Sequence, residues 1–199
     1  MHEPLIKNLK RYVPVSDEEA ATIQSLFTHR KFRKRQFISQ EGDIVRYDSF
    51  VVWGLTRIYE VDRKGKEHVI QFGPEDWWIG DLYSFLTETP SGYAIDCLED
   101  TEILQISRPD LEQLYVRVPS MERCFRIMIQ NAYIAATQRV SANLTRSAAQ
   151  RYEDFLSRYP HIGKRVPDRQ IASYLGITPQ SLSRDPRALT YGNGFNYLT

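Results

Sequence analysis

The chain has 199 residues, of which 42% are hydrophobic and 26% are charged, so it is long enough to form one large or two small globular domains. Its formal net charge is only +1, which gives no sign of a nucleic-acid partner for the molecule as a whole. Cys97 and Cys124 are the only cysteines, which excludes a disulfide framework, a cysteine-ligated zinc site and an iron–sulfur cluster.

The charge is unevenly distributed along the chain. Residues 139–199 carry nine Lys or Arg and four Asp or Glu, a net +5, whereas the first 138 residues carry 17 and 21, a net −4. This division predicts two segments with different tasks, and a chance distribution is the alternative. The N-terminus MHEPLIKNLKRY lacks the apolar core of a signal peptide, and no apolar run approaches the ~18 residues of a membrane span. We therefore expect a cytoplasmic protein with no membrane partner.

The first predicted element is a short amphipathic helix in VSDEEAATIQSLF, residues 15–27. Ser16 and Glu19 have the spacing of a capping box, and one apolar face follows. From Lys31 onward, short apolar runs alternate with turn signals such as DRKGKE, residues 62–67, where Gly65 suits the positive φ of a hairpin turn. Several short strands of this kind predict an antiparallel sandwich or roll.

A different segment, FGPEDWWIGDLYSFLTETPSG at residues 72–92, interrupts these strands. Trp77 and Trp78 are large apolar side chains that we expect in the core. Gly80-Asp81-Leu82 could begin a short helix whose free amides would hold an anion. Judged on the residues alone, a surface turn is the favoured interpretation of these three positions.

A long helix is predicted for PSMERCFRIMIQNAYIAATQRVSANL, residues 119–144, with Pro119 at its start. Apolar residues recur every three or four positions and form one stripe: Met121, Phe125, Met128, Ile129, Ala132, Ala135, Ala136 and Val140. This stripe must be buried on the roll, on a second copy of the chain, or on both. We favour a coiled-coil-like homodimer. TRSAAQRYEDFLSRYP, residues 145–160, predicts another helix that Pro160 ends.

The basic end carries a helix-turn-helix pattern. Asp168 lies in the first turn of one helix, Gly176 can end it in the left-handed conformation, and Thr178 can cap the next helix. The small Ala172 would let the two helices cross closely. A second helix that enters the major groove N-terminus first would expose residues able to contact bases and phosphates. The predicted DNA-binding residues are Arg169, Thr178, Gln180, Ser181, Ser183 and Arg184, and an ordinary helical hairpin is the alternative.

With a roll, a long helix and a terminal helix-turn-helix in this order, the chain resembles the CRP/FNR family of bacterial transcription regulators. The stretches that carry the resemblance are ISQEGD, FVVWGLTRIYEVDRKGKEHVIQF, WWIGDL and IASYLGITPQSLSR. The resemblance implies an α+β fold with a cyclic-nucleotide-binding-like sensor roll at 1–116, a dimerisation helix at 117–143, and a winged-helix-type DNA-binding domain at 144–199. It also implies a homodimer on promoter DNA, with RNA polymerase as a further partner.

The sensor departs from the family pattern. Cyclic-nucleotide members have a Gly-Glu pair and a later Arg that neutralises the cyclic phosphate. Here Gly80-Asp81 stands for the pair, and no Lys or Arg lies between Asp81 and Ser107, although the Arg is expected near Ser91-Gly92. A buried phosphate without a cation would be costly. We therefore expect a degenerate effector pocket at Gly80, Asp81, Leu82 and Ser91, no cAMP binding and no cofactor, with an unknown small effector or none.

Two other classes of function were weighed. An enzyme is disfavoured because the sequence contains no phosphate-binding loop, metal-spaced cluster or serine-elbow motif.

A ligand-binding roll that acts through protein contacts would gain weight if the DNA-binding end were broken. Asp185-Pro186 raises that question, because Pro186 ends a helix and Asp185 is pushed out of the helical region. Either the chain has diverged here, or the residues beyond Arg184 come from a shifted reading frame, which we favour.

Overall fold

The structure is a computed structural model that describes residues 1–178. It divides into two compact units, Met1–Ile134 and Ala135–Thr199, the second of which is described as far as Thr178. Within residues 1–178, no helix combines the length and the apolar character that crossing a membrane would require.

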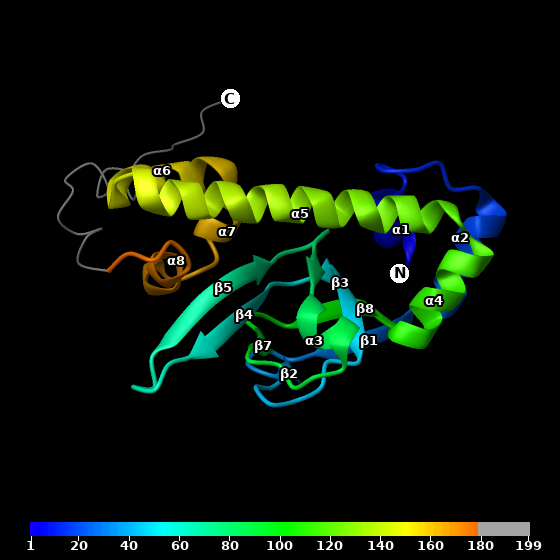
Figure 1. Cartoon of the computed structure of the whole chain (residues 1–199), viewed down its shortest axis with the longest axis horizontal. Helices are drawn as coiled ribbons and strands as arrows, with labels where there is room; N and C mark the ends of the chain where they lie inside the picture. The colour runs from blue at the N-terminus through cyan, green and yellow to red at the C-terminus, as the bar shows by residue number, and fades with distance from the viewer. Residues whose placement is uncertain (179–199) are drawn as a thin grey trace, which may run out of the picture. The chain divides into compact units, whose positions relative to one another are not determined.

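The first unit is an antiparallel β-roll made of two four-stranded sheets (Figure 1). One sheet has the order β1 (Thr28–Phe32), β8 (Thr101–Ser107), β3 (Tyr47–Trp53) and β6 (Trp78–Ile79). The other has the order β2 (Phe37–Ser39), β7 (Ala94–Cys97), β4 (Thr56–Val61) and β5 (Glu67–Gly73). The predicted mixed fold with an antiparallel roll is confirmed.

The predicted hairpin is the connection between β4 and β5. Gly65 has a φ of +77°, a value that side-chain-bearing residues rarely adopt. Asp62 closes the turn by accepting hydrogen bonds from the backbone N–H groups of Lys64 (2.8 Å) and Lys66 (3.0 Å). These bonds and a contact with His68 lower the pKa of Asp62 to about 2. The turn signal in the sequence therefore located this hairpin correctly.

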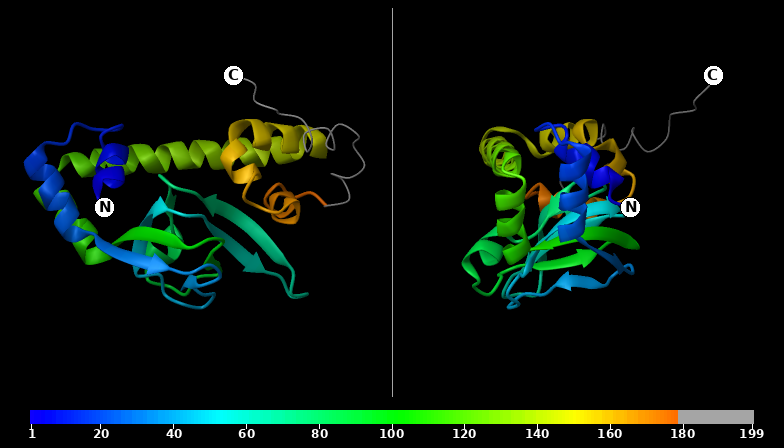
Figure 2. Two further views of the ribbon diagram at one scale, coloured as in Figure 1. Left: turned by 180° about the vertical axis from the view of Figure 1, so that it is seen from behind. Right: turned by 90° about the vertical axis from the view of Figure 1, so that its right-hand side faces the viewer.

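Helices cover one sheet of the roll. They are α1 (Glu3–Leu9), α2 (Asp17–Leu26), α4 (Arg108–Arg117) and the first turns of α5 (Ser120–Thr145), and they gather at one end of the first unit (Figure 2). Their apolar side chains pack on the face that carries Phe50, Leu104 and Ile106. Helix α2 begins with the predicted capping box, because Ser16 accepts from the Glu19 N–H and Glu19 from the Ser16 N–H. Helix α1 was not predicted, although its buried Leu5, Ile6 and Leu9 share one face.

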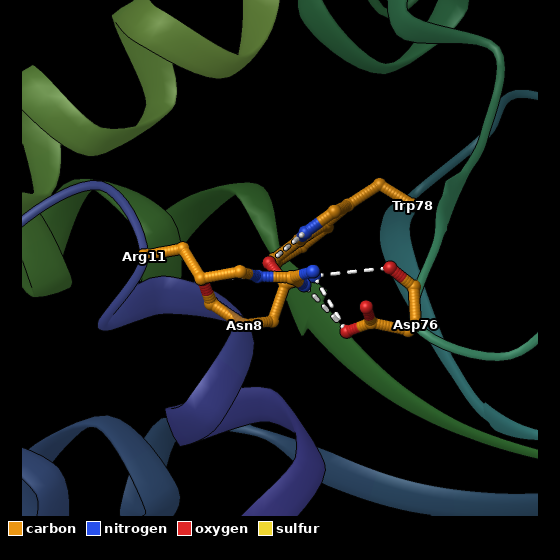
Figure 3. Close-up of polar contacts among 4 residues, drawn as sticks. All are labelled: Asn8, Arg11, Asp76 and Trp78. Atoms are coloured by element: carbon orange, nitrogen blue, oxygen red, sulfur yellow. Dashed lines mark hydrogen bonds and ion pairs between the residues drawn. The ribbon is translucent and has the colours of Figure 1, made fainter.

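A polar cluster joins α1 to the loop between β5 and β6 (Figure 3). The Asn8 side-chain amide donates to the Asp76 carbonyl oxygen (3.0 Å) and to Asp76 Oδ1 (2.8 Å). The Arg11 guanidinium forms an ion pair with the same carboxylate at 2.6 Å, and Trp78 Nε1 donates to Asn8 Oδ1 at 3.4 Å. Asn8 is only 3% exposed, so its hydrogen bonds are made away from water and hold α1 in one position.

Trp78 is part of the main core, as predicted, and makes edge-to-face contacts with three aromatic rings. The ring centroids of Phe27, Phe50 and Phe125 lie 6.1, 5.6 and 5.1 Å from that of Trp78. Trp77 is half-buried. Because Trp78 immediately precedes Ile79 and Gly80, its packing fixes where the segment around Gly80 leaves the sheet.

The predicted long helix is confirmed as α5, Ser120–Thr145. Its first turns are buried through Met121, Cys124 and Phe125. Farther along, the apolar side chains are exposed: Ile129 (47%), Tyr133 (73%), Ile134 (52%), Val140 (59%) and Leu144 (82%). The stripe is thus buried on the roll only at its beginning.

The second unit is helical in the part that the structure describes. It contains the end of α5, then α6 (Ala148–Arg158), α7 (Pro160–Gly163) and α8 (Asp168–Tyr174). Helix α6 ends next to Pro160, as predicted, and the Phe155 ring packs against Tyr159 and Tyr174 in a tilted arrangement, each at a centroid distance of 5.5 Å. The buried apolar side chains of this unit are Phe155, Ile162, Val166, Ile171, Ala172 and Leu175.

Candidate functional site

Gly80-Asp81-Leu82 begins a helix, so the expectation of a surface turn was wrong. Asp81 is the N-cap of α3 (Leu82–Thr87), and its Oδ1 accepts hydrogen bonds from the backbone N–H groups of Tyr83 (3.0 Å) and Ser84 (3.2 Å). An aspartate at this position satisfies the otherwise unpaired N–H groups of a helix start and stabilises it by about 0.5–2 kcal/mol. The amides that could have bound an anion are therefore already occupied by the protein's own carboxylate.

The second oxygen of Asp81 is also engaged. Ser91 Oγ donates to Asp81 Oδ2 at 2.7 Å, and the Tyr93 N–H donates to Ser91 Oγ at 3.0 Å. Asp81 is 6% exposed and Ser91 is 4% exposed, so water has little access to this contact. Ser91 lies where the resemblance predicts the phosphate-binding Arg. The segment 80–91, which we call the cassette, is closed by an internal hydrogen bond at that point.

Further hydrogen bonds tie the cassette to the loop between β2 and β3. Ser84 Oγ accepts from the Val45 N–H (3.0 Å) and donates to the Thr89 carbonyl oxygen (2.6 Å). The Gly42 N–H donates to the Ser91 carbonyl, and the Ser91 N–H to the Asp43 carbonyl, both at 2.8 Å. The cassette is therefore held at Ser84 and at Ser91 by contacts that need no bound molecule.

Gly80 leaves room for the side chain of Asp48 beside it. A Cβ at position 80 would lie 3.0 Å from Asp48 Oδ1, which is tighter than ordinary contact. Asp48 is on β3 and is half-buried, and the Ser49 N–H donates to its Oδ1 at 3.0 Å. Burial raises the pKa of Asp48 to about 7, although that hydrogen bond acts in the opposite direction.

Asp48 predicts a defined pH dependence of stability. Between about pH 4 and pH 7 the unfolded chain ionises Asp48 while the folded protein keeps it protonated, so stability falls as pH rises through this window. We expect Asp48→Asn to raise the free energy of unfolding at about pH 8 by about 1–3 kcal/mol and to flatten the slope below pH 7. Urea denaturation across this range measures both effects. The exposed Glu60→Gln should leave the slope unchanged, and an equal response of the two variants would contradict the assignment.

One cation, Arg108, contacts the cassette away from Asp81 and Ser91. Arg108 reaches α3 only at its C-terminal end, where Nη1 donates to the Leu86 carbonyl oxygen (2.7 Å) and pairs with Glu88 (3.3 Å). No contact between a cationic side chain and Asp81 or Ser91 is present in the part of the chain that the structure describes. The position where the resemblance would place the phosphate-binding Arg is occupied by the neutral Ser91.

A buried ion network that the sequence did not reveal connects three strands of the second sheet. Arg57 on β4 binds Asp96 on β7 with two hydrogen bonds, Nε–Oδ1 at 2.8 Å and Nη2–Oδ2 at 3.0 Å. Its Nη1 binds Glu67 on β5 at 2.5 Å, and its Cζ lies 4.1 Å from the centre of the Tyr59 ring. The two carboxylates raise the pKa of Arg57 and outweigh the opposing effect of burial. All three guanidinium nitrogens of Arg57 thus donate hydrogen bonds within the protein.

The two cysteines are buried and unpaired. Burial raises the pKa of both thiols to about 11, which keeps them protonated and unreactive at neutral pH. Among residues 1–178, no three His, Cys, Asp or Glu side chains are grouped as metal ligands would be.

The second candidate site is the start of the predicted helix-turn-helix. Helix α8 ends with Gly176 at φ +64°, as the sequence predicted. The Ile177 N–H donates to the Ala172 carbonyl oxygen (2.9 Å) and the Gly176 N–H to that of Ser173 (3.1 Å), which is a Schellman ending. Ile171 and Ala172 are fully buried. A short helix that ends in a sharp turn at Gly176 is therefore present where the first helix of the motif was predicted.

Helix α6 holds α8 in place through polar contacts. Arg151 Nη1 donates to the Leu175 carbonyl oxygen (2.8 Å), which would otherwise lack a partner at the end of α8. At the other end of α8, the Tyr152 hydroxyl donates to Asp168 Oδ1 at 2.8 Å. Burial and this carboxylate raise the pKa of Tyr152 to about 12. The orientation of α8 is thus fixed at both ends within the second unit.

Only part of the predicted DNA-binding set lies in the described region. Arg169 is exposed in the first turns of α8, and Thr178 is exposed just beyond the turn. Two further basic residues lie close by in the sequence: Lys164 is exposed and Arg165 is half-buried. The remaining predicted residues lie outside the described residues: Gln180, Ser181, Ser183 and Arg184.

Comparisons with known proteins agree with this architecture. Residues 29–117 match the family model described as the cyclic nucleotide-binding domain. FixK2 from Bradyrhizobium japonicum has a similar structure, with a TM-score of 0.70 and 22% identity over 83% of each chain. The c-di-GMP-responsive global regulator CLP of Xanthomonas campestris gives 0.66 and 15%, covering 89% of this chain and 93% of its own. The catabolite activator protein of Thermus thermophilus gives 0.60 and 21%, covering 93% and 87%.

These likenesses show the fold, in which a cyclic nucleotide-binding roll precedes a long helix. No curated protein sequence matches the chain. The family model therefore identifies the roll, and the ligand chemistry of the cassette depends on its own residues.

Proposed function

We propose that this chain is a transcription regulator of the CRP/FNR type that binds double-stranded promoter DNA as a homodimer and does not bind cAMP through its sensor roll. The observation that carries the proposal is the ending of α8, where Gly176 and Ile177 form the sharp turn that a helix-turn-helix requires. The exposed Arg169 on this helix supports a contact with the phosphate backbone. RNA polymerase is the further partner that the proposal implies, and we expect no catalytic activity.

The homodimer is supported by the exposed part of the α5 stripe. Ile129 and Val140, two members of the stripe, are each about half exposed or more, although large apolar side chains on a helix are normally buried. A second copy of α5 would cover them with the same chemistry. Two recognition helices on a two-fold axis would then read two half-sites one turn of DNA apart.

DNA binding of this kind predicts a characteristic salt dependence. In a mobility-shift titration on promoter DNA, the logarithm of the binding constant should fall linearly with the logarithm of the salt concentration, because phosphate contacts release counterions. Arg169→Ala should reduce the slope by about 0.9, which corresponds to one phosphate contact. Arg33→Ala removes an equally exposed arginine from the first unit and is the matched control. A slope that is unchanged in Arg169→Ala would remove Arg169 from the interface.

The same assay separates the proposal from its alternative, a regulatory roll that acts only through protein contacts. Wild-type protein that binds no DNA at low salt, even as a dimer, would favour the alternative. A variant with Asp185→Ala and Pro186→Ala removes the two residues that the sequence predicts to end the second helix. DNA binding that appears only in this variant would show that Asp185 and Pro186 prevent binding, and that the rest of the chain can still bind DNA.

A further inference from the structure

The roll contains a cavity that the cassette does not use. Its volume is about 530 Å³, within the range of about 300–1,000 Å³ that is typical of small-molecule sites. It shares Ile79 and Gly80 with the cassette region, but Asp81, Leu82 and Ser91 do not line it. A molecule bound here would therefore meet groups other than the phosphate position of a cyclic nucleotide.

One wall of the cavity is apolar. Ile38, Ile79 and Ile95 line it and belong to the core between the two sheets. These branched side chains come from β2, β6 and β7, so both sheets contribute to the wall. Apolar surface of this kind favours a ligand with a compact hydrocarbon body, because each square ångström removed from water contributes about 25 cal/mol.

The lining also includes polar groups inside the roll. Gln105 Nε2 donates to Ser49 Oγ at 3.1 Å, and these residues are 8% and 1% exposed. Ser39 also lines the cavity, and its Oγ is buried with no hydrogen-bond partner among the described residues. A buried hydroxyl without a partner is destabilising, because it has lost its hydrogen bonds to water. A polar group on a ligand would supply the missing hydrogen bond.

A cation lies on the same lining. Arg46 is exposed and makes no hydrogen bond or ion pair with any residue between 1 and 178. Asp43 also lines the cavity, and its Oδ2 accepts from the Gln40 N–H at 2.8 Å, so part of its hydrogen-bonding capacity is already used. With one acidic group already present, the lining suits a single carboxylate opposite Arg46 better than a multiply charged anion.

We propose that this cavity binds a small organic monocarboxylate, with the hydrocarbon body against the three isoleucines, a neutral polar group near Ser39, Ser49 and Gln105, and the carboxylate at Arg46. The proposal concerns the roll alone and holds whether or not the second unit binds DNA. It adds a ligand class to a sensor whose cassette is closed.

The test uses the full chain and a panel of benzoate, phenylacetate and 4-hydroxybenzoate, each paired with its neutral carboxamide. We expect saturable binding of at least one acid by calorimetry, and binding of its amide about 10-fold weaker or less. Arg46→Gln should reduce the affinity for that acid by a similar factor, and Arg46→Lys should restore part of it. Arg33→Gln, at an exposed site outside the lining, should have no effect.

Removal of polar groups from the lining provides the second arm. Ser49→Val with Gln105→Leu replaces both members of the internal hydrogen bond by apolar groups, which avoids leaving one partner unpaired. This variant should lose binding while its melting transition stays cooperative. The proposal is overturned if no acid in the panel binds, or if substitution of Arg46 leaves the affinity unchanged. It is also overturned if the variant with Ser49→Val and Gln105→Leu still binds. A mobility shift on the same samples reports on DNA binding separately, so the two proposals can fail independently.

Discussion

Replacing Arg57 with methionine should lower the free energy of unfolding of the first unit by about 3–5 kcal/mol, the largest single effect that we expect in this chain. The guanidinium is 8% exposed and makes both hydrogen bonds to Asp96, whose side chain is 12% exposed. Without Arg57, the Asp96 carboxylate would remain buried and unpaired. Glu67 is 48% exposed and can be solvated, so it contributes little to the cost. Urea denaturation followed by tryptophan fluorescence measures the change.

A second variant separates the loss of the ion pair from a general intolerance of substitution at β4. Arg57→Met combined with Asp96→Leu removes both buried charges, and replacement of a buried pair by apolar residues is often close to neutral. We expect the double variant to recover most of the lost stability. If the double variant is as unstable as Arg57→Met, the cost comes from packing. A loss below about 1 kcal/mol in the single variant would mean that the network contributes little.

Restoring the family pattern in the cassette should create cAMP binding. In the wild-type protein both Asp81 oxygens are occupied and Ser91 is neutral, so a cyclic phosphate would meet a buried carboxylate without a cation. We expect no saturable binding of cAMP to the wild-type protein. Asp81→Glu with Ser91→Arg supplies the Gly-Glu pair and the Arg that the family pattern requires. The charge-assisted contact should make cAMP binding to this variant about 10- to 100-fold stronger than binding to a variant with a neutral side chain at position 91.

The matched control is Asp81→Glu with Ser91→Gln, which has a long polar side chain and no charge. Isothermal calorimetry with cAMP on the three proteins decides the question, and near-ultraviolet circular dichroism confirms that the core is intact in each. Equal binding by the Arg and Gln variants would show that charge is not the determining factor. Micromolar binding by the wild-type protein would show that Asp81 and Ser91 rearrange to admit the nucleotide.

The sequence located features that depend on neighbours in the chain. The capping box at Ser16, the hairpin at Gly65 and the turn at Gly176 were predicted because each is decided by a few adjacent residues. Helix α1 could have been found by the same means, since Pro4 and the spacing of Leu5, Ile6 and Leu9 favour a helix.

Features that depend on partners far along the chain were not predictable. Arg57 and Asp96 are 39 residues apart and meet only because β4 pairs with β7 in a particular register. The sequence showed that the cassette lacks a cation, but not that Asp81 would use both oxygens within the protein, because the Asp81–Ser91 contact needs the cassette to close. The surface turn expected at Gly80 was wrong for a different reason, since the local cap at Asp81 makes a short helix more stable than a turn.

The tie between Asn8, Arg11 and Asp76 has a consequence for where the first unit can be divided. The residues that match the family model run from 29 to 117, yet the core that surrounds Phe50 takes Leu5, Leu9 and Ile23 from before that range and Met121 from after it. A fragment trimmed to the family match would expose this apolar face and leave Asp76 without its partners. The residues that complete the core of the first unit therefore extend beyond the family match at both of its ends.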